Sequence, residues 1–400
     1  MLLSHIEEVC KEFELRDLSL DQKENFGLVY GEAGSWQKAH MMATLAVETS
    51  EHMFGIENER TLDNTLKLAK IYGKLGNYKK AEELELAVVC ASKKSLGEEH
   101  PKTFASMKDL AMTYHQLGHL EKALKLEILL VDAKKKAFNE EHAETLSSME
   151  DLAVTYAQLG LFQETEKLEL AVMHIRQRVF RDDQPAILKS MAKLAQTFFQ
   201  QGKFKEAEEL LLGVIYACKR VFGEEHPVTL RNMANLAQTF RQLGKFKEVE
   251  ELLLVVIYAC KIAFGEEHPV TLQNMANLAQ TFLQQGKFKE AEELLLGVIY
   301  ACKRVFGEEH PVTLENMANL AQTFRHQGKF KEAEELQLKR MALGEDNPQT
   351  LMSMSNLAQT YHDQGCLQEA EELGLSMMHA KKSVLGEENC WVLCVCCVIE

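Results

Sequence analysis

The sequence predicts an all-α protein, a solenoid of about nine two-helix repeats. The first observation is a glycine that recurs before an Ala/Glu-rich stretch, seven times at a spacing of 42 residues and once at 37. Repeats of 20–50 residues are typical of solenoids and related arrays. The second observation is the helical period of the apolar residues inside each repeat. The glycines are Gly34, Gly76, Gly118, Gly160, Gly202, Gly244, Gly286, Gly328 and Gly365.

Each repeat is predicted to contain a first helix, a turn and a second helix. In residues 228–242, Met233, Leu236 and Phe240 belong to one apolar helical stripe. Gly244 then supplies a turn, because glycine adopts positive φ without strain. The second helix, about residues 246–263, is apolar on more than one side, as expected for a helix packed between neighbours.

Prolines and loop sequences set the boundaries of the repeats. Each of the six prolines is predicted to begin a first helix, where its missing N–H costs nothing. We expect residues 1–19 to form an N-terminal capping helix and residues 20–393 to form tandem 42-residue repeats, with a shortened unit near 329–348. Five residues are absent from the second helix of that unit. Residues 394–400 are predicted to be a Cys-rich tail or a truncated capping helix.

Composition excludes several classes of function. The chain has 45 Lys+Arg and 60 Asp+Glu, a net charge of −15, which argues against nucleic-acid binding. Its longest apolar run, residues 252–260, is far shorter than the roughly 20 residues of a membrane span. His5, Glu7 and Glu8 interrupt the segment where a signal peptide would be apolar. Ten cysteines without an export signal indicate reduced thiols, so a cytoplasmic protein is expected.

No catalytic, cofactor or metal site is predicted. The sequence lacks nucleotide-binding glycine loops, H-E-x-x-H and G-x-S-x-G. One cysteine and one histidine recur per repeat, but helices packed 8–10 Å apart cannot bring single residues together on one zinc ion or in one disulfide. We therefore expect the cysteines in the core and the histidines in loops or helix caps. They are Cys218, Cys260 and Cys302, and His226, His268 and His310.

Helix pairs that carry N-L-A-x-x-F/Y and then G-K-F/Y-x-E-A resemble tetratricopeptide repeats. The 42-residue period and the loop L/F-G-E-E-H-P-x-T-L resemble the subclass found in kinesin light chains and in nucleotide-binding immune-type proteins of fungi. The resemblance covers about residues 17–393. It implies a right-handed α–α superhelix whose concave face, lined by the first helices, binds an extended peptide of a partner protein.

A polar face on the first helices supplies the candidate binding residues. Asparagine is a weak helix former, so a row of asparagines at one repeat position needs a reason. Amide groups both donate and accept hydrogen bonds, as a peptide backbone requires. Passive copying of one asparagine by recent duplication is the alternative. The predicted backbone-binding residues are Asn235, Asn277, Asn319 and Asn356, with Gln238, Gln280 and Gln322 beside them. Lys193, Arg231, Arg241 and Arg325 are predicted to bind acidic groups of a mildly acidic or mixed peptide.

The sequence thus predicts a non-catalytic scaffold or adaptor that binds protein partners, without nucleic-acid or small-molecule substrates and without a cofactor. Its most specific version is a kinesin-light-chain-like cargo adaptor. The alternative is a regulatory or sensor repeat array related to the nucleotide-binding immune-type proteins, tethered to a membrane through its C-terminal cysteines. The cysteines that lipidation would modify are Cys394, Cys396 and Cys397.

Overall fold

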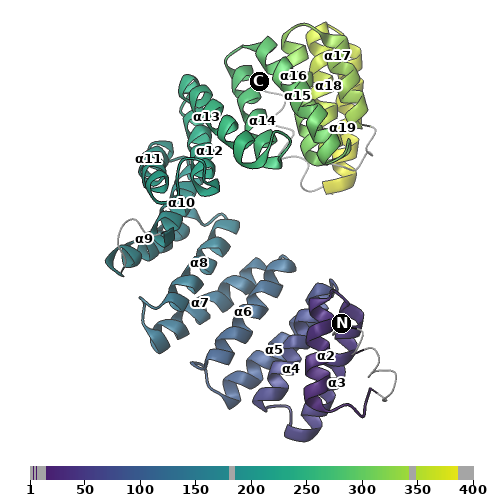
Figure 1. Cartoon of the computed structure of the whole chain (residues 1–400). Helices are drawn as coiled ribbons and strands as arrows, with labels where there is room; N and C mark the ends of the chain where they lie inside the picture. Colours follow the sequence, from purple (N-terminus) through teal and green to yellow (C-terminus); the bar gives the residue numbers. More distant parts are fainter. Residues whose placement is uncertain (1–2, 4–5, 7–14, 180–184, 342–347, 386–400) are drawn as a thin grey trace. The chain divides into compact units, whose positions relative to one another are not determined.

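The computed structural model describes residues 3, 6, 15–179, 185–341 and 348–385, and these residues form α-helices and no β-strand. Two compact units make up the chain, Met1–Gln201 (unit 1) and Gly202–Glu400 (unit 2). Within each unit every helix packs against the helix before it and the helix after it (Figure 1). The tail at 394–400, with the three cysteines proposed for lipidation, lies outside the described residues.

Helices α2 to α10 belong to unit 1 and helices α11 to α19 to unit 2. Those of unit 1 are α2 (Leu20–Glu32), α3 (Trp36–Phe54), α4 (Glu59–Lys74), α5 (Tyr78–Ser95), α6 (Pro101–Gln116), α7 (Leu120–Phe138), α8 (Ala143–Gln158), α9 (Phe162–Val179) and α10 (Pro185–Gln200). Those of unit 2 are α11 (Phe204–Val221), α12 (Pro227–Gln242), α13 (Phe246–Phe264), α14 (Pro269–Gln284), α15 (Phe288–Val305), α16 (Pro311–His326), α17 (Phe330–Met341), α18 (Pro348–Gln364) and α19 (Leu367–Leu385).

Even-numbered helices are the first helices of the nine repeats, and odd-numbered helices are the second helices. All nine marker glycines between the two adopt positive φ, from 71° to 82°, which confirms the predicted turns. Second helices contain 18 or 19 residues except α17, which contains 12. The sequence-predicted α-solenoid is therefore correct for the arrangement of helices within each unit.

Histidines and prolines fix the starts of the first helices. All six prolines stand at the first position of a helix. A histidine stands directly before the proline, as His226 does before α12 and His268 before α14. Its Nδ1 accepts a hydrogen bond from a backbone N–H of the first turn at 3.2–3.3 Å. A phenylalanine ring stacks on it, with 4.9 Å between the ring centroids of Phe264 and His268. The predicted cap role of these histidines is confirmed.

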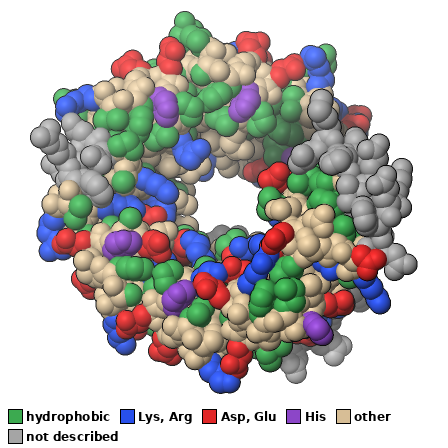
Figure 2. Space-filling model, turned by 60° about the horizontal axis from the view of Figure 1, so that its bottom comes forward, with side chains coloured by type: hydrophobic (Ala, Val, Ile, Leu, Met, Phe, Trp, Pro, Cys, Tyr) green, Lys and Arg blue, Asp and Glu red, His purple; other side chains and the backbone are tan. Residues whose placement is uncertain are grey.

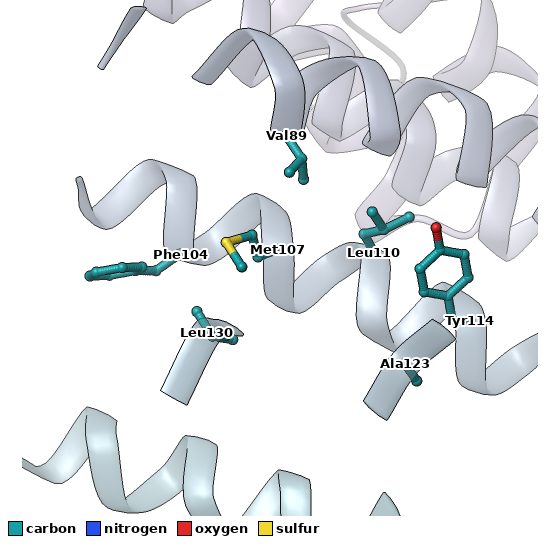
Figure 3. Close-up of a cluster of buried hydrophobic side chains, with 7 residues drawn as sticks. All are labelled: Val89, Phe104, Met107, Leu110, Tyr114, Ala123 and Leu130. Carbon is teal, nitrogen blue, oxygen red and sulfur yellow. The ribbon is translucent and has the colours of Figure 1, made fainter. Parts of the chain in front are cut away.

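The core lies between each second helix and the first helices on either side of it. Figure 3 shows one cluster, in which Val89 of α5 and Leu130 of α7 enclose Met107 of α6. The recurring cysteines occupy equivalent core positions in unit 2 and are fully buried. Burial raises the pKa of the Cys218, Cys260 and Cys302 thiols, so they remain protonated and contribute as small apolar groups.

Part of the segment predicted as an N-terminal cap is described. Ile6 and Leu18 are buried against Tyr30 of α2 and Met42 of α3. Residues 15–18 form a turn, and Ser19 caps α2. This segment covers apolar surface of the first repeat.

Candidate functional site

First helices form the inner side of the stack in unit 2. Helix α16 packs against its sequence neighbours α15 and α17, and it also contacts the first helices α14 and α18. Among the described residues no two second helices make a comparable contact with each other. The first helices of successive repeats thus lie closer together than the second helices do. An extended segment bound along the first helices would pass from one repeat to the next over the shortest distance.

The four predicted asparagines lie at equivalent, half-buried positions on these first helices. Asn277 accepts a hydrogen bond from Gln273 at 3.4 Å. The side chains of Asn235, Asn319 and Asn356 form no hydrogen bond with any residue that the structure describes. Three half-buried amides in register are therefore available to donate and to accept hydrogen bonds.

The glutamines are placed less uniformly. Gln238 and Gln322 are exposed, one helical turn from Asn235 and Asn319. Gln280 instead accepts a hydrogen bond from Arg241 on the preceding first helix. This bond joins α12 to α14 and occupies both side chains.

Most of the predicted cations are engaged within the chain. Lys193 of α10 pairs with Glu150 of α8 at 3.4 Å, and Arg325 of α16 pairs with Asp363 of α18 at 3.5 Å. Arg231 is exposed. Burial lowers the pKa of the Arg241 guanidinium, which nevertheless stays charged at neutral pH. These residues link adjacent repeats as well as contributing positive charge to the face.

In unit 1 the same face is charged. The positions aligned with Asn235 hold Asn25 on α2 and then Lys67, Asp109, Asp151 and Lys193 on α4 to α10. Ion pairs connect successive first helices here, Lys70 with Asp109 at 2.9 Å and Lys108 with Asp151 at 2.8 Å. Figure 2 shows Lys and Arg side chains interspersed with Asp and Glu over the surface it presents. The first-helix face is therefore amide-rich in unit 2 and mixed in charge over α4 to α10 of unit 1.

Two cavities open between first helices of unit 1 and were not predicted. One of about 340 Å³ lies between α2 and α4 over α3 and is floored by small residues, including Gly27 and Ala43. The other, of about 300 Å³, lies between α6 and α8 over α7. The signal for the first was visible in the sequence, since Gly27 replaces an alanine that all later repeats have. Both volumes suit a side chain or small group of a ligand.

Buried carboxylates were also missed. Glu85 on α5 is almost wholly buried, and burial raises the pKa of its carboxyl to about 7, while Asp109 adds to the effect and Thr113 and Lys70 oppose it. Glu127 on α7 is buried beside Thr155 and 3.0 Å from His115. Burial also raises the pKa of Glu169, which accepts a hydrogen bond from Thr197 at 2.7 Å. Each of these acids lies on a second helix and contacts the next first helix.

No arrangement for metal binding or membrane crossing is found in the part of the chain that the structure describes. Its His, Cys, Asp and Glu side chains form no group of three that could hold a metal ion. Its helices include none that is both long and apolar enough to traverse a lipid bilayer.

Comparison with known families agrees with this architecture. The family model for the tetratricopeptide repeat matches residues 61–128, 144–215, 187–257 and 271–342, and a second model of that description matches 350–389. Together these matches span most of the chain. A search of curated protein sequences gives no significant match.

Three solved structures resemble the chain, one of them in sequence and two in fold. A Podosopora anserina protein described as a kinesin light chain with nearly identical TPR-like repeats is 31% identical over 51% of this chain and 96% of its own, with a TM-score of 0.47. The apo form of RapI is 13% identical over 92% of this chain and 99% of its own, with a TM-score of 0.60. The quorum sensor NprR from B. thuringiensis is 13% identical over 90% and 98%, with a TM-score of 0.57.

Proposed function

The chain belongs to the tetratricopeptide repeat family, and we propose that it is a non-catalytic scaffold or adaptor that binds an extended segment of a partner protein along its first helices. One observation carries this proposal. Asn235, Asn319 and Asn356 stand in register and half-buried, without a hydrogen bond to any described residue. An amide left half-desolvated gains free energy when a ligand supplies the missing donor and acceptor.

The partner segment follows from the chemistry of the face. An extended backbone presents alternating N–H and C=O groups. One asparagine per repeat can bind these groups whatever side chains the peptide carries. Gln238 and Gln322 lie beside these contacts, and Arg231 supplies exposed positive charge. A mildly acidic or mixed peptide is therefore the preferred ligand, since complementary charge speeds encounter.

Within this class we propose a cargo-adaptor role like that of kinesin light chains. Its support is the 42-residue repeat with the G-E-E-H-P loop between second and first helices. In this chain a recurring hydrogen bond holds the loop in place. Thr271 donates to the carbonyl of Gly265 at 2.8 Å, and Thr229 and Thr313 repeat that contact with Gly223 and Gly307. The loop therefore fixes the angle at which one repeat follows another.

The test is affinity purification with mass spectrometry from native lysate. Wild type is compared with the triple variant Asn235→Ala, Asn277→Ala and Asn319→Ala. A matched control changes three exposed second-helix residues of the same unit, Lys205→Ala, Lys247→Ala and Lys289→Ala. All three proteins must unfold at the same temperature.

We expect a defined partner set that the asparagine variant loses and the lysine variant retains. A synthetic peptide from the recovered partner should then bind the asparagine variant at least about tenfold more weakly by calorimetry, the scale of one or two lost hydrogen bonds. Equal recovery by all three proteins would show that the asparagine face is not the binding surface.

A further inference from the structure

The outer side of unit 2 carries a row of exposed apolar residues that the fold does not use. Leu212 and Tyr216 of α11 lie one helical turn apart and are 48% and 67% exposed. The equivalent residues are Leu254 and Tyr258 of α13, at 51% and 68%, and Leu296 and Tyr300 of α15, at 50% and 65%. We call these six residues the Leu–Tyr row. The near-equal values show that three consecutive repeats present the same surface.

The core is complete without the Leu–Tyr row. Helix α11 buries Val214 and Cys218, and α15 buries Val298 and Cys302, on their inner sides. Tyr216 and Tyr258 form no hydrogen bond with the described residues, and the guanidinium of Arg304 lies over the ring of Tyr300, 5.9 Å from its centroid. Large apolar side chains that neither support the core nor satisfy a polar group indicate an interaction surface.

Two glycines on the same side of these helices support this inference independently. Gly213 and Gly297 are exposed in the interior of α11 and α15, where glycine is an unfavourable residue. A Cβ atom built at either position would have no atom within 4 Å, so nothing inside the chain requires glycine there. Close approach by another chain at α11 and α15 would account for it, while α13 has Val255 at the aligned position.

Unit 1 does not continue the row. At the positions aligned with Tyr216 it has Glu48, Cys90, Asp132 and His174. Tyrosine is enriched in protein interfaces because its rigid ring is apolar and its hydroxyl tolerates water. The absence of tyrosine at these four positions confines the surface to unit 2.

We propose that the Leu–Tyr row binds a second copy of this chain through the same row. The six side chains leave on the order of 700 Å² exposed, and Val255 and Ile262 of α13 bring the surface close to the roughly 800 Å² that each partner buries in a stable interface. A two-fold dimer requires a self-complementary surface. A second copy meets that requirement, because it has the same residues at the same spacing over three repeats.

Charge selects the orientation of the two copies. On the outer side of α11, Glu209 precedes Leu212 and Arg220 follows Tyr216, and Glu293 and Arg304 repeat this order on α15. Both arginines also interact within their own chain, Arg304 with Glu267 at 2.8 Å. A two-fold axis parallel to the row sets each helix antiparallel to its own copy. Leucine then faces tyrosine, and Glu209 faces Arg220. The other axis in the plane of the interface would set glutamate against glutamate, which is repulsive.

Sedimentation velocity over concentrations up to about 100 µM tests the proposal, because a dissociation constant in the micromolar range would be resolved. Wild type should dimerise, and the variant Tyr216→Ser, Tyr258→Ser and Tyr300→Ser should dimerise at least about tenfold more weakly. The control Leu86→Ser with Leu129→Ser removes exposed apolar surface from unit 1 and should dimerise as wild type does. Circular dichroism must show equal helix content in all three proteins.

The charges give a second test that does not remove apolar surface. Glu209→Arg with Glu293→Arg should weaken dimerisation, and adding Arg220→Glu with Arg304→Glu should restore it. A wild type that stays monomeric throughout, or a tyrosine variant that dimerises as tightly as wild type, would overturn the proposal. Failure of the charge reversal to be rescued would overturn the antiparallel orientation.

Discussion

Unit 1 and unit 2 are built from the same repeat, yet they fill one interior position in different ways. Where a second helix meets the next first helix, unit 1 has Glu85, Glu127 and Glu169. Helices α11, α13 and α15 of unit 2 have Leu211, Leu253 and Leu295 at the aligned positions, all almost wholly buried, and the shortened α17 has the buried Gln337 there. The backbone thus accepts a carboxylate or an isobutyl group at the same place, and the surrounding side chains decide which is tolerated.

A threonine on the next first helix is the partner that makes the carboxylate possible. Thr155 donates to Glu127, and Thr197 donates to Glu169. Unit 2 keeps the threonine, but there its hydroxyl donates to a carbonyl of its own helix, as Thr281 does to Asn277 at 2.9 Å. The threonine hydroxyl therefore has a hydrogen-bond acceptor in both units. The buried carboxylate depends on the threonine, whereas the threonine does not depend on the carboxylate.

The largest effect is expected when unit 2 is given the acid of unit 1. Leu253→Glu removes a buried leucine and introduces a carboxyl among Val249, Ile257 and other apolar groups, while the hydroxyl of Thr281 already donates to the Asn277 carbonyl. We expect a loss of about 3–5 kcal/mol in the free energy of unfolding of unit 2. Hydrogen exchange should show faster exchange of the backbone amides of α12–α14 and unchanged exchange in α4–α6. A variant as protected as wild type would show that the two interiors are interchangeable.

The reverse substitution should stabilise unit 1. Glu85→Leu removes the cost of burying an ionised carboxylate and leaves Thr113 able to donate to the carbonyl of residue 109, as the threonines of unit 2 do. We expect the free energy of opening of α5 and α6, measured by hydrogen exchange of their backbone amides, to increase by about 1–2 kcal/mol at pH 8.

The stability that Glu85→Leu adds should increase as pH rises. Burial raises the pKa of Glu85 to about 7, above its ordinary value of 4.5. Between these values the folded state binds more protons than the unfolded state, so the wild type loses stability as pH rises from about 4.5 to 7. The advantage of Glu85→Leu should therefore be full at pH 8 and small at pH 5. An advantage that is equal at both pH values would contradict the assignment of the effect to ionisation of Glu85.

The sequence predicted the features that a single repeat determines. Positive φ at glycines such as Gly244, helix starts at prolines such as Pro269 and burial of Cys260 each follow from local chemistry and from one helical period. The interior carboxylates were not predicted, because a second helix contacts two neighbours and its period alone does not show which polar residue lies between them. The partners of Arg241 and Arg325 were not predicted either, since they depend on the stagger of successive first helices.

The histidine caps should contribute equally to the stability of both units. The two units would then differ in their interiors and not in these caps. His100 of unit 1 and His268 of unit 2 each accept a backbone N–H at 3.3 Å. Replacing either by alanine should cost about 1 kcal/mol locally, whereas asparagine should restore most of it. Hydrogen exchange at the first turns of α6 and α14 measures both. Unequal costs would mean that the two units also differ in their loops.

The smallest effect is expected on the charged first-helix face of unit 1. Lys108 and Asp151 form an ion pair at 2.8 Å, and both side chains are nearly half exposed. Water and salt screen such a pair, so a double-mutant cycle with Lys108→Ala and Asp151→Ala should give a coupling of no more than about 0.5 kcal/mol at low salt. The coupling should vanish in about 1 M salt. A coupling of that size would let unit 1 lose these charges at almost no cost in stability. A coupling above about 1 kcal/mol would instead assign the two charges to holding successive repeats together.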